Sequence, residues 1–242
     1  MIKKILLAAI IVFAMQSFAQ NNKGQLLVSG SLNYYTNKSN RSDSYNLNSF
    51  TSTSQSNQQI FGASLQVGYF VTNHLAVGLG GWTYHRKSSY TNTNSSDVIT
   101  SVVSKDRDTD YTVGPFLRYN QTLFKSKFGF FLNLNSSYAY TDRHNETVNY
   151  NSTDPNSPFT NKYQKVGNGF DVALAPGLFY FINSRISLET TLGSVYFSNT
   201  DLRDPGRNST YKEHYVGSSF SIASIWLGAT FYLGRNKNTE ND

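Results

Sequence analysis

The sequence from Phe61 to His85, FGASLQVGYFVTNHLAVGLGGWTYH, decides the fold because it forms two alternating stretches around a short turn. In the first stretch, large apolar residues occupy every second position and small or polar residues lie between them, which is the period of a β-strand. The second stretch repeats this period from Leu75 to Leu79. So short a turn can close only an antiparallel pair. The segment therefore predicts a β-hairpin with one apolar face.

The same alternation recurs along the rest of the chain. The further predicted strands are Gly24–Thr36, Tyr111–Asn120, Phe128–Tyr140, Phe170–Tyr180, Ile186–Tyr196 and a last strand that runs through Ile225 to Leu233. Between them, polar stretches that we interpret as long exposed loops are Asn37–Asn57, Ser88–Arg107, Asp142–Lys165 and Asn199–His214. The other connections are short. Regular alternation of long loops and short turns is typical of outer-membrane barrels, whereas a soluble meander has no need of it.

Composition is consistent with one exported domain. Residues 1–19 carry two lysines, an apolar run and a Ser-Phe-Ala ending, which together predict a signal peptide. We expect the barrel to occupy 20–234 and a polar tail 235–242. The mean hydropathy of −0.42 is compatible with a transmembrane barrel, because half of the side chains of each strand face the lumen and can be polar. The net charge of +6 is spread along the chain, whereas a nucleic-acid-binding protein concentrates its basic residues in a patch. We therefore expect no nucleic acid as a partner.

Aromatic residues are placed where two membrane interfaces would lie. Those near the short turns are Tyr69, Tyr119, Phe128, Tyr180 and Phe231, and those near the long loops are Tyr34, Tyr111, Tyr140 and Tyr196. Girdles of this kind flank the apolar band of transmembrane barrels. The expected fold is an all-β, eight-stranded, antiparallel up-and-down transmembrane β-barrel with long extracellular loops and short periplasmic turns.

Three recurring pieces resemble the small outer-membrane β-barrel family of Gram-negative bacteria, the OmpA/OmpX/OmpW-like group. They are Val67-Gly68-Tyr69-Phe70, Gly114-Pro115-Phe116-Leu117-Arg118-Tyr119 and Leu227-Gly228-Ala229-Thr230-Phe231. The resemblance implies a barrel wall in the outer membrane and no particular activity. The Phe18-Ala19-Gln20 ending looks like the signals of Bacteroidetes. Many family members end on an aromatic residue, whereas here the polar tail follows the last strand.

Residues that could support catalysis or metal binding are scattered. Asp106, Asp108 and Asp110 have the spacing of a calcium loop, but its glycine and glutamate positions hold Tyr111 and Leu117. We expect these aspartates to pair with Arg86, Lys87, Lys105 or Arg107. The four histidines are dispersed, and no Ser/His/acid set matches the lipid-modifying barrels. We expect no catalytic residue, metal or cofactor.

Arg118 and Glu189 form the sharpest candidate pair. Each lies a few residues from a short turn, and both point inward on the alternation, so they should meet at one depth. The two interpretations are a lumen charge pair that stabilises the wall and a gate linked to protons. Large residues predicted inward at the same end are Phe70, Phe116, Phe131, Phe179 and Tyr232. Because the interior of an eight-stranded barrel is only as wide as its side chains, these residues predict a plug.

The preferred hypothesis is a monomeric, non-enzymatic barrel in contact with outer-membrane lipid, whose loops contact an extracellular ligand or partner. A narrow, porin-like channel for small or apolar solutes is the alternative. A lipid-modifying enzyme is a third possibility.

Overall fold

A computed structural model describes residues 23–45, 50–95, 100–123, 127–151, 154–206, 209–221 and 224–234. The predicted signal peptide and the polar tail lie outside these residues, so that division of the chain stays a prediction. The strands are β1 (Leu26–Tyr45), β2 (Phe50–Phe70), β3 (Leu75–Ser95), β4 (Thr100–Thr122), β5 (Phe128–Asn151), β6 (Asp154–Asn183), β7 (Ile186–Thr191), β8 (Ser194–Asp204), β9 (Ser209–Ser219) and β10 (Trp226–Leu233). No helix of the described ranges is long and apolar enough to cross a membrane.

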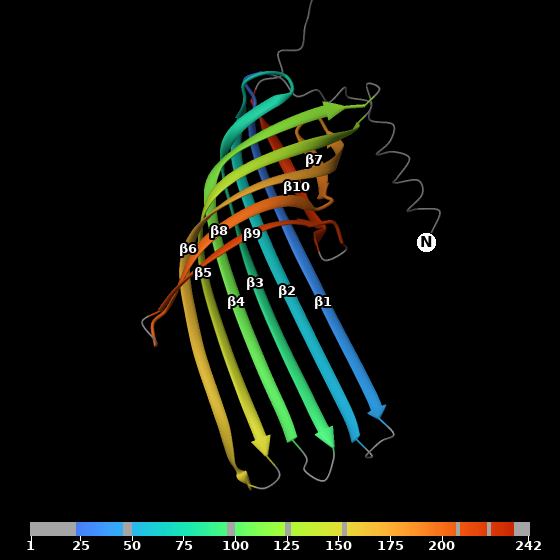
Figure 1. Cartoon of the computed structure of the whole chain (residues 1–242). Coiled ribbons are helices and arrows are strands. Elements are labelled where there is room, and N and C mark those ends of the chain that lie inside the picture. The colour runs from blue at the N-terminus through green and yellow to red at the C-terminus, as the bar shows by residue number, and fades with distance from the viewer. Residues whose placement is uncertain are drawn as a thin grey trace, which may run out of the picture.

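Eight of the strands close into a ring. Each strand from β1 to β6 pairs antiparallel with its successor, and β10 joins β7 to β1. The closing seam runs from Leu26 opposite Leu233 to Leu32 opposite Leu227. Figure 1 shows the short turns at one end of this ring and long strand extensions at the other. The predicted fold class is confirmed.

The four stretches predicted as long loops are mostly strand, and that part of the prediction was wrong. The β1–β2 ladder continues without a shift from Leu26 opposite Tyr69 to Tyr45 opposite Phe50. The β3–β4 ladder extends in the same way, and the β5–β6 ladder shifts register only between Asn149 and Asn151. Polar Asn, Ser and Thr side chains gave no apolar face to detect, yet the backbones of these stretches pair with neighbouring strands. The outer end is therefore a sheet that continues well past the apolar band.

The predicted seventh strand is interrupted at Leu192 and Gly193. On β6, Pro176 stands opposite this interruption, and its carbonyl accepts a hydrogen bond from the Leu192 amide at 3.0 Å. Proline has no amide hydrogen for the ladder, and one extra residue on the partner strand forms a β-bulge. Gly193 adopts a φ of +141° there. The bulge reverses the alternation, so Tyr196, predicted outward in the outer girdle, faces the interior side of the sheet opposite Ala173.

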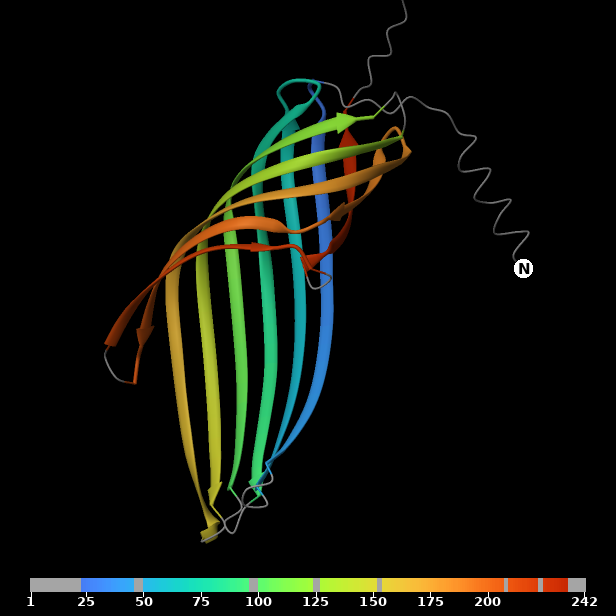
Figure 2. The ribbon, with the colours of Figure 1, turned by 45° about the vertical axis from the view of Figure 1, so that its right-hand side comes forward.

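The hairpin of β8 and β9 departs from the ring. β8 pairs with β6 from Val166 to Leu174, and β9 pairs with β8 alone. Among the described residues, no strand pairs with β1 beyond Leu32 on the side opposite β2. Figure 2 shows this hairpin turning away from the long strands. The barrel is thus a closed ring near the short turns and a sheet with two free edges above it.

The outer face of the ring is apolar where the sequence predicts it. Exposed large side chains include Leu65, Leu79, Leu117 and Leu132 at mid-height. Of the predicted girdles, those whose side chains are exposed are Tyr69, Tyr119, Phe128 and Phe231 near the short turns and Tyr34, Tyr111 and Tyr140 near the extensions. A face this apolar over a whole ring is stable only against another apolar medium.

Gly78 supplies a test of the packing inside this wall. It faces Gly68 across the β2–β3 ladder, and a Cβ on Gly78 would lie 2.7 Å from the Phe116 ring and would collide with the Val67 carbonyl. Overpacking of this kind typically costs about 1–3 kcal/mol. We expect Gly78→Ala to lower the free energy of unfolding by that amount, measured by urea titration in detergent.

Gly30→Ala is the matched control, because a Cβ at Gly30 meets its nearest atom, the Ser64 carbonyl oxygen, at 3.7 Å. Its effect should stay within about 0.5 kcal/mol. Equal losses from the two substitutions would contradict the close approach at Gly78.

Candidate functional site: the filled interior

Alternation sends every second side chain of each strand into the ring, and at the short-turn end these side chains fill it. A cluster of buried residues comprises Leu27, Phe70, Ala76, Phe116, Phe131, Phe179, Phe181 and Tyr232. It contains all five residues predicted to form the plug. Aromatic rings meet across it, with Phe181 5.1 Å from Tyr232 and Phe70 6.0 Å from Tyr232 between centroids. This layer packs the short-turn end of the interior with mostly apolar side chains.

The structure brings Arg118 of β4 and Glu189 of β7 together across the interior. Arg118 Nη1 donates to Glu189 Oε2 at 2.9 Å, and Nη2 donates to Oε1 at 2.6 Å. This is a bidentate pair, the geometry in which a guanidinium holds a carboxylate most firmly. The two side chains are 1% and 7% exposed, so little water reaches them.

Neighbouring groups complete the coordination of the Arg118–Glu189 pair. Arg118 Nε donates to Asn120 Oδ1 at 2.7 Å, and its guanidinium carbon lies 4.0 Å from the centroid of the Phe131 ring. On the other partner, Ser187 Oγ donates to Glu189 Oε1 at 3.1 Å. A buried ion pair is tolerated when its remaining donors and acceptors are satisfied, as they are here.

Polar side chains span the interior above the charge pair. Gln66 of β2 donates to Asn135 of β5 at 3.0 Å, although two strands of the ring separate them. Higher still, the Trp226 indole lies where a Cβ on Gly62 would be, so it occupies the space that this glycine leaves. The interior is therefore crossed at several levels by side chains of its own wall.

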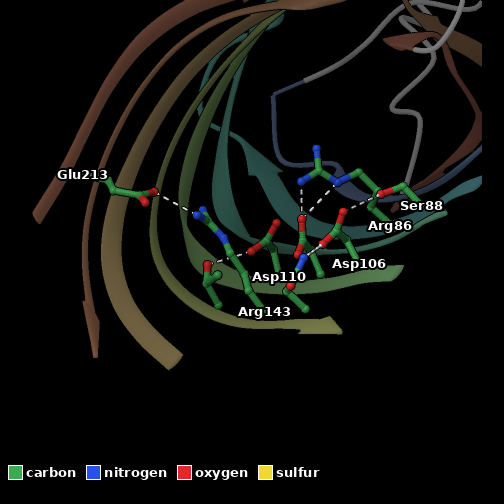
Figure 3. A network of polar contacts seen from close by, with 9 residues as sticks. Arg86, Ser88, Asp106, Asp110, Arg143 and Glu213 are labelled. Carbon is green, nitrogen blue, oxygen red and sulfur yellow. Dashed lines mark hydrogen bonds and ion pairs between the residues drawn. The ribbon is translucent and has the colours of Figure 1, made fainter. Parts of the chain in front are cut away.

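A second polar network lies on the interior face where the sheet rises above the ring (Figure 3). Arg86 is hydrogen-bonded to Asp108, and Thr141 donates to Asp110 at 2.7 Å. Arg143 reaches past two strands to Glu213 of β9 at 2.9 Å. Of the partners expected from the sequence, Arg86 pairs with Asp108, whereas Lys87, Lys105 and Arg107 face the other side of the sheet. Arg143 falls in a stretch predicted as a loop and so had no predicted face.

The alternating aspartates of β4 are held by protein groups. Asp106 accepts hydrogen bonds from Ser88, at 3.3 Å, and from Asn145. Burial would lower the pKa of Arg86, but the facing Asp108 carboxylate outweighs burial and raises that pKa. Arg86 therefore stays charged across the ordinary pH range, and the network connects neighbouring strands.

The histidines stay apart in the structure. His74 lies in the β2–β3 turn with Nδ1 3.1 Å from the Asn120 carbonyl, and His85 is 3.0 Å from the Thr109 hydroxyl on the outer face. His144 Nε2 lies 3.1 Å from Asp142 Oδ1, and His214 is on β9. Sequence reasoning missed Phe181 of the buried cluster, although it shares the parity of Phe179.

Comparisons with known proteins identify the fold. The sequence model of the outer membrane protein beta-barrel domain matches residues 5–222. The chain belongs to this family. It lies in the outer membrane, with membrane lipid around its apolar face. No curated protein matches it.

Solved structures of small outer-membrane barrels are similar in fold. OprG of Pseudomonas aeruginosa is 11% identical, with a TM-score of 0.38 over 90% of this chain and 100% of its own. Ail of Yersinia pestis is 12% identical, with a TM-score of 0.31 over 87% of this chain and 99% of its own. The N-terminal barrel of Pseudomonas aeruginosa OprF is 13% identical, with a TM-score of 0.21 over 87% and 100%. At these identities and TM-scores, the similarity says nothing about the function of this chain. The Bacteroidetes origin stays a prediction.

The Arg118–Glu189 pair generates a stability prediction. Glu189→Gln leaves the Arg118 cation buried without a counter-charge, and breaking a buried pair typically costs about 3–5 kcal/mol. We expect the variant to lose that much stability in detergent, read from the midpoint of heat-modified gel migration and from urea unfolding. Arg118→Met combined with Glu189→Met should recover much of the loss, because no buried charge is left unpaired. A double variant as unstable as Glu189→Gln would show that the loss does not come from the unpaired Arg118 cation.

Proposed function

We propose that this protein is a non-enzymatic outer-membrane barrel whose lumen is plugged and whose extracellular sheet contacts ligands or partners at the cell surface. The observation that supports the plug is the stack of side chains across the ring, from the aromatic cluster through Arg118 and Glu189 to Gln66 and Asn135. Each layer is built from opposite walls of the barrel. Water and ions have no polar file to follow through the aromatic layer.

The surface role is supported by how the chain distributes its residues. Six long strands, β1 to β6, rise past the apolar band, and their extensions are rich in Asn, Ser and Thr, with a few exposed aromatic side chains such as Phe159. Internal pairs such as Arg143–Glu213 stiffen this sheet, so it presents side chains in fixed positions. Among the described residues, the part of β1 beyond Asn33 pairs with β2 alone, so an extended segment of a partner can add to its other edge as a strand.

A second candidate function has one observation in its favour. Where β1 and β9 do not pair, Leu32, Tyr34 and Val216 are 58%, 70% and 75% exposed. Apolar side chains beside an unpaired flank would suit an apolar solute that leaves the interior sideways above the plug. In this version of the channel hypothesis, an apolar solute passes through the side of the barrel, so the aromatic layer does not have to open.

Planar-bilayer recording tests the plug. We expect the wild-type protein to insert without steady conductance, because the aromatic cluster leaves no hydrated path. Phe70→Ser with Phe116→Ser removes two rings of the cluster and adds hydroxyl groups, so conductance should appear in this variant. Heat-modifiable migration confirms that both proteins are folded. Steady wild-type currents would refute the plug.

Shortened hairpins test the surface role. Because Thr36 pairs with Gln59 and Lys87 with Arg107, residues 37–58 and 88–106 can each be replaced by Asn-Gly, which favours a tight hairpin turn. The shortened barrel should insert normally, yet a deletion strain that carries it should adhere to glycan-coated surfaces as poorly as the deletion strain itself. Full rescue of adhesion by the shortened barrel would place the function elsewhere.

A further inference from the structure

Basic side chains gather on the outward face of the sheet just above the outer aromatic girdle. Lys87 of β3 pairs directly with Arg107 of β4, and Arg107 pairs with His144 of β5. Two residues further along β4, Lys105 points to the same face. Like charges directly opposite each other destabilise a sheet. The wall therefore holds an arrangement that is unfavourable unless something negative covers it.

Few acids neutralise this cluster. Glu146 pairs with Lys105 in the ladder, but Lys162 holds its carboxylate at 2.8 Å. The hydrogen bond from Lys162 and its charge lower the pKa of Glu146, which stays ionised and engaged. Within the ranges that the structure describes, Lys87, Lys105 and Arg107 form no salt bridge.

The same side chains line a hollow in the outward face. Its volume is about 730 Å³, and its walls include the basic residues Lys87, Lys105, Arg107, His144 and Lys162. The two acids in the lining, Asp106 and Glu146, are already engaged by Asn145 and Ser88 and by Lys162. Gln59 and Gln164 lie at its margins and add amide donors. A concave surface with several cations and amides suits phosphate groups, which accept many hydrogen bonds.

The height of this hollow points to the source of the phosphate. On β4, Arg107 lies four positions beyond Tyr111 of the outer girdle, roughly 13 Å along the strand and less along the membrane normal because barrel strands tilt. The headgroup layer begins where the aromatic girdle ends. A cation at this position, facing away from the interior, meets the headgroups of the outer leaflet.

We propose that the hollow formed by Lys87, Lys105, Arg107 and their neighbours binds the phosphate groups of an outer-leaflet glycolipid. The cations of this site face the opposite side of the sheet from the plug and the interior network, although Ser88, Asp106 and Asn145 of that network also border the hollow. It anchors the extracellular sheet to the membrane surface and fixes its height there.

Lipid binding to the full-length protein in phosphatidylcholine nanodiscs tests the proposal. The probes are lipid A, dephosphorylated lipid A and inorganic phosphate, and the readouts are the thermal midpoint and the lipid retained in native mass spectra. Lipid A should raise the midpoint, whereas the dephosphorylated form should not. K87Q/K105Q/R107Q should weaken lipid A retention roughly 100-fold. Each cation near the membrane surface contributes about 1 kcal/mol, and a loss of about 1.4 kcal/mol weakens binding tenfold.

R185Q/R203Q/K212Q is the matched control, because it removes the same charge from exposed positions outside the hollow. It should bind lipid A like the wild type. Without lipid A, K87Q/K105Q/R107Q should be at least as stable as the wild type, since repulsion is relieved. Equal retention by the wild type and K87Q/K105Q/R107Q, an equal effect of dephosphorylated lipid A, or displacement by equimolar phosphate would overturn the proposal.

Discussion

The width of an eight-stranded ring is the constraint on which the rest of this structure depends. Such a ring encloses only enough space for the side chains of its own wall. Each inward position must therefore agree with those opposite it in size and polarity. Phe116 can lie flat against the wall because Gly68 and Gly78 leave it room, and the rings of Phe70 and Tyr232 meet across the space that remains. The filled lumen follows from the strand number together with these choices.

The fold and part of the interior were accessible from sequence because a period of two is a strong signal. This period predicted which residues of most strands face outward. It also predicted that Arg118 and Glu189 both point inward, and their similar distances from the short turns predicted that they lie at one depth. Phe181 could have been found by the same rule. Such predictions succeed where an apolar medium outside the wall imposes a regular pattern.

The extensions could not be found this way because both of their faces are wet. From Asn37 to Asn57 the few large apolar or aromatic residues, Tyr45, Leu47 and Phe50, are too few to mark a face, whereas the backbone pairing of the two strands continues throughout the described part. The bulge opposite Pro176 was also hidden, since a single inserted residue changes parity without changing composition. Tyr196 was misplaced for that reason, and the Arg143–Glu213 pair and the outward cation hollow both lie in stretches that had no predicted face.

The seam between β1 and β10 has a consequence for how the protein forms. Leu26 meets Leu233, so the first and last described strands of the ring must find each other before it is closed. Pairings between such distant parts of a chain are slow, and until they form the sheet exposes two adhesive edges. Local hairpins such as β2–β3 can assemble early, but sealing waits for almost the entire polypeptide. Closure of the ring is therefore a late step of assembly. Before closure, the exposed strand edges can pair with other chains and cause aggregation.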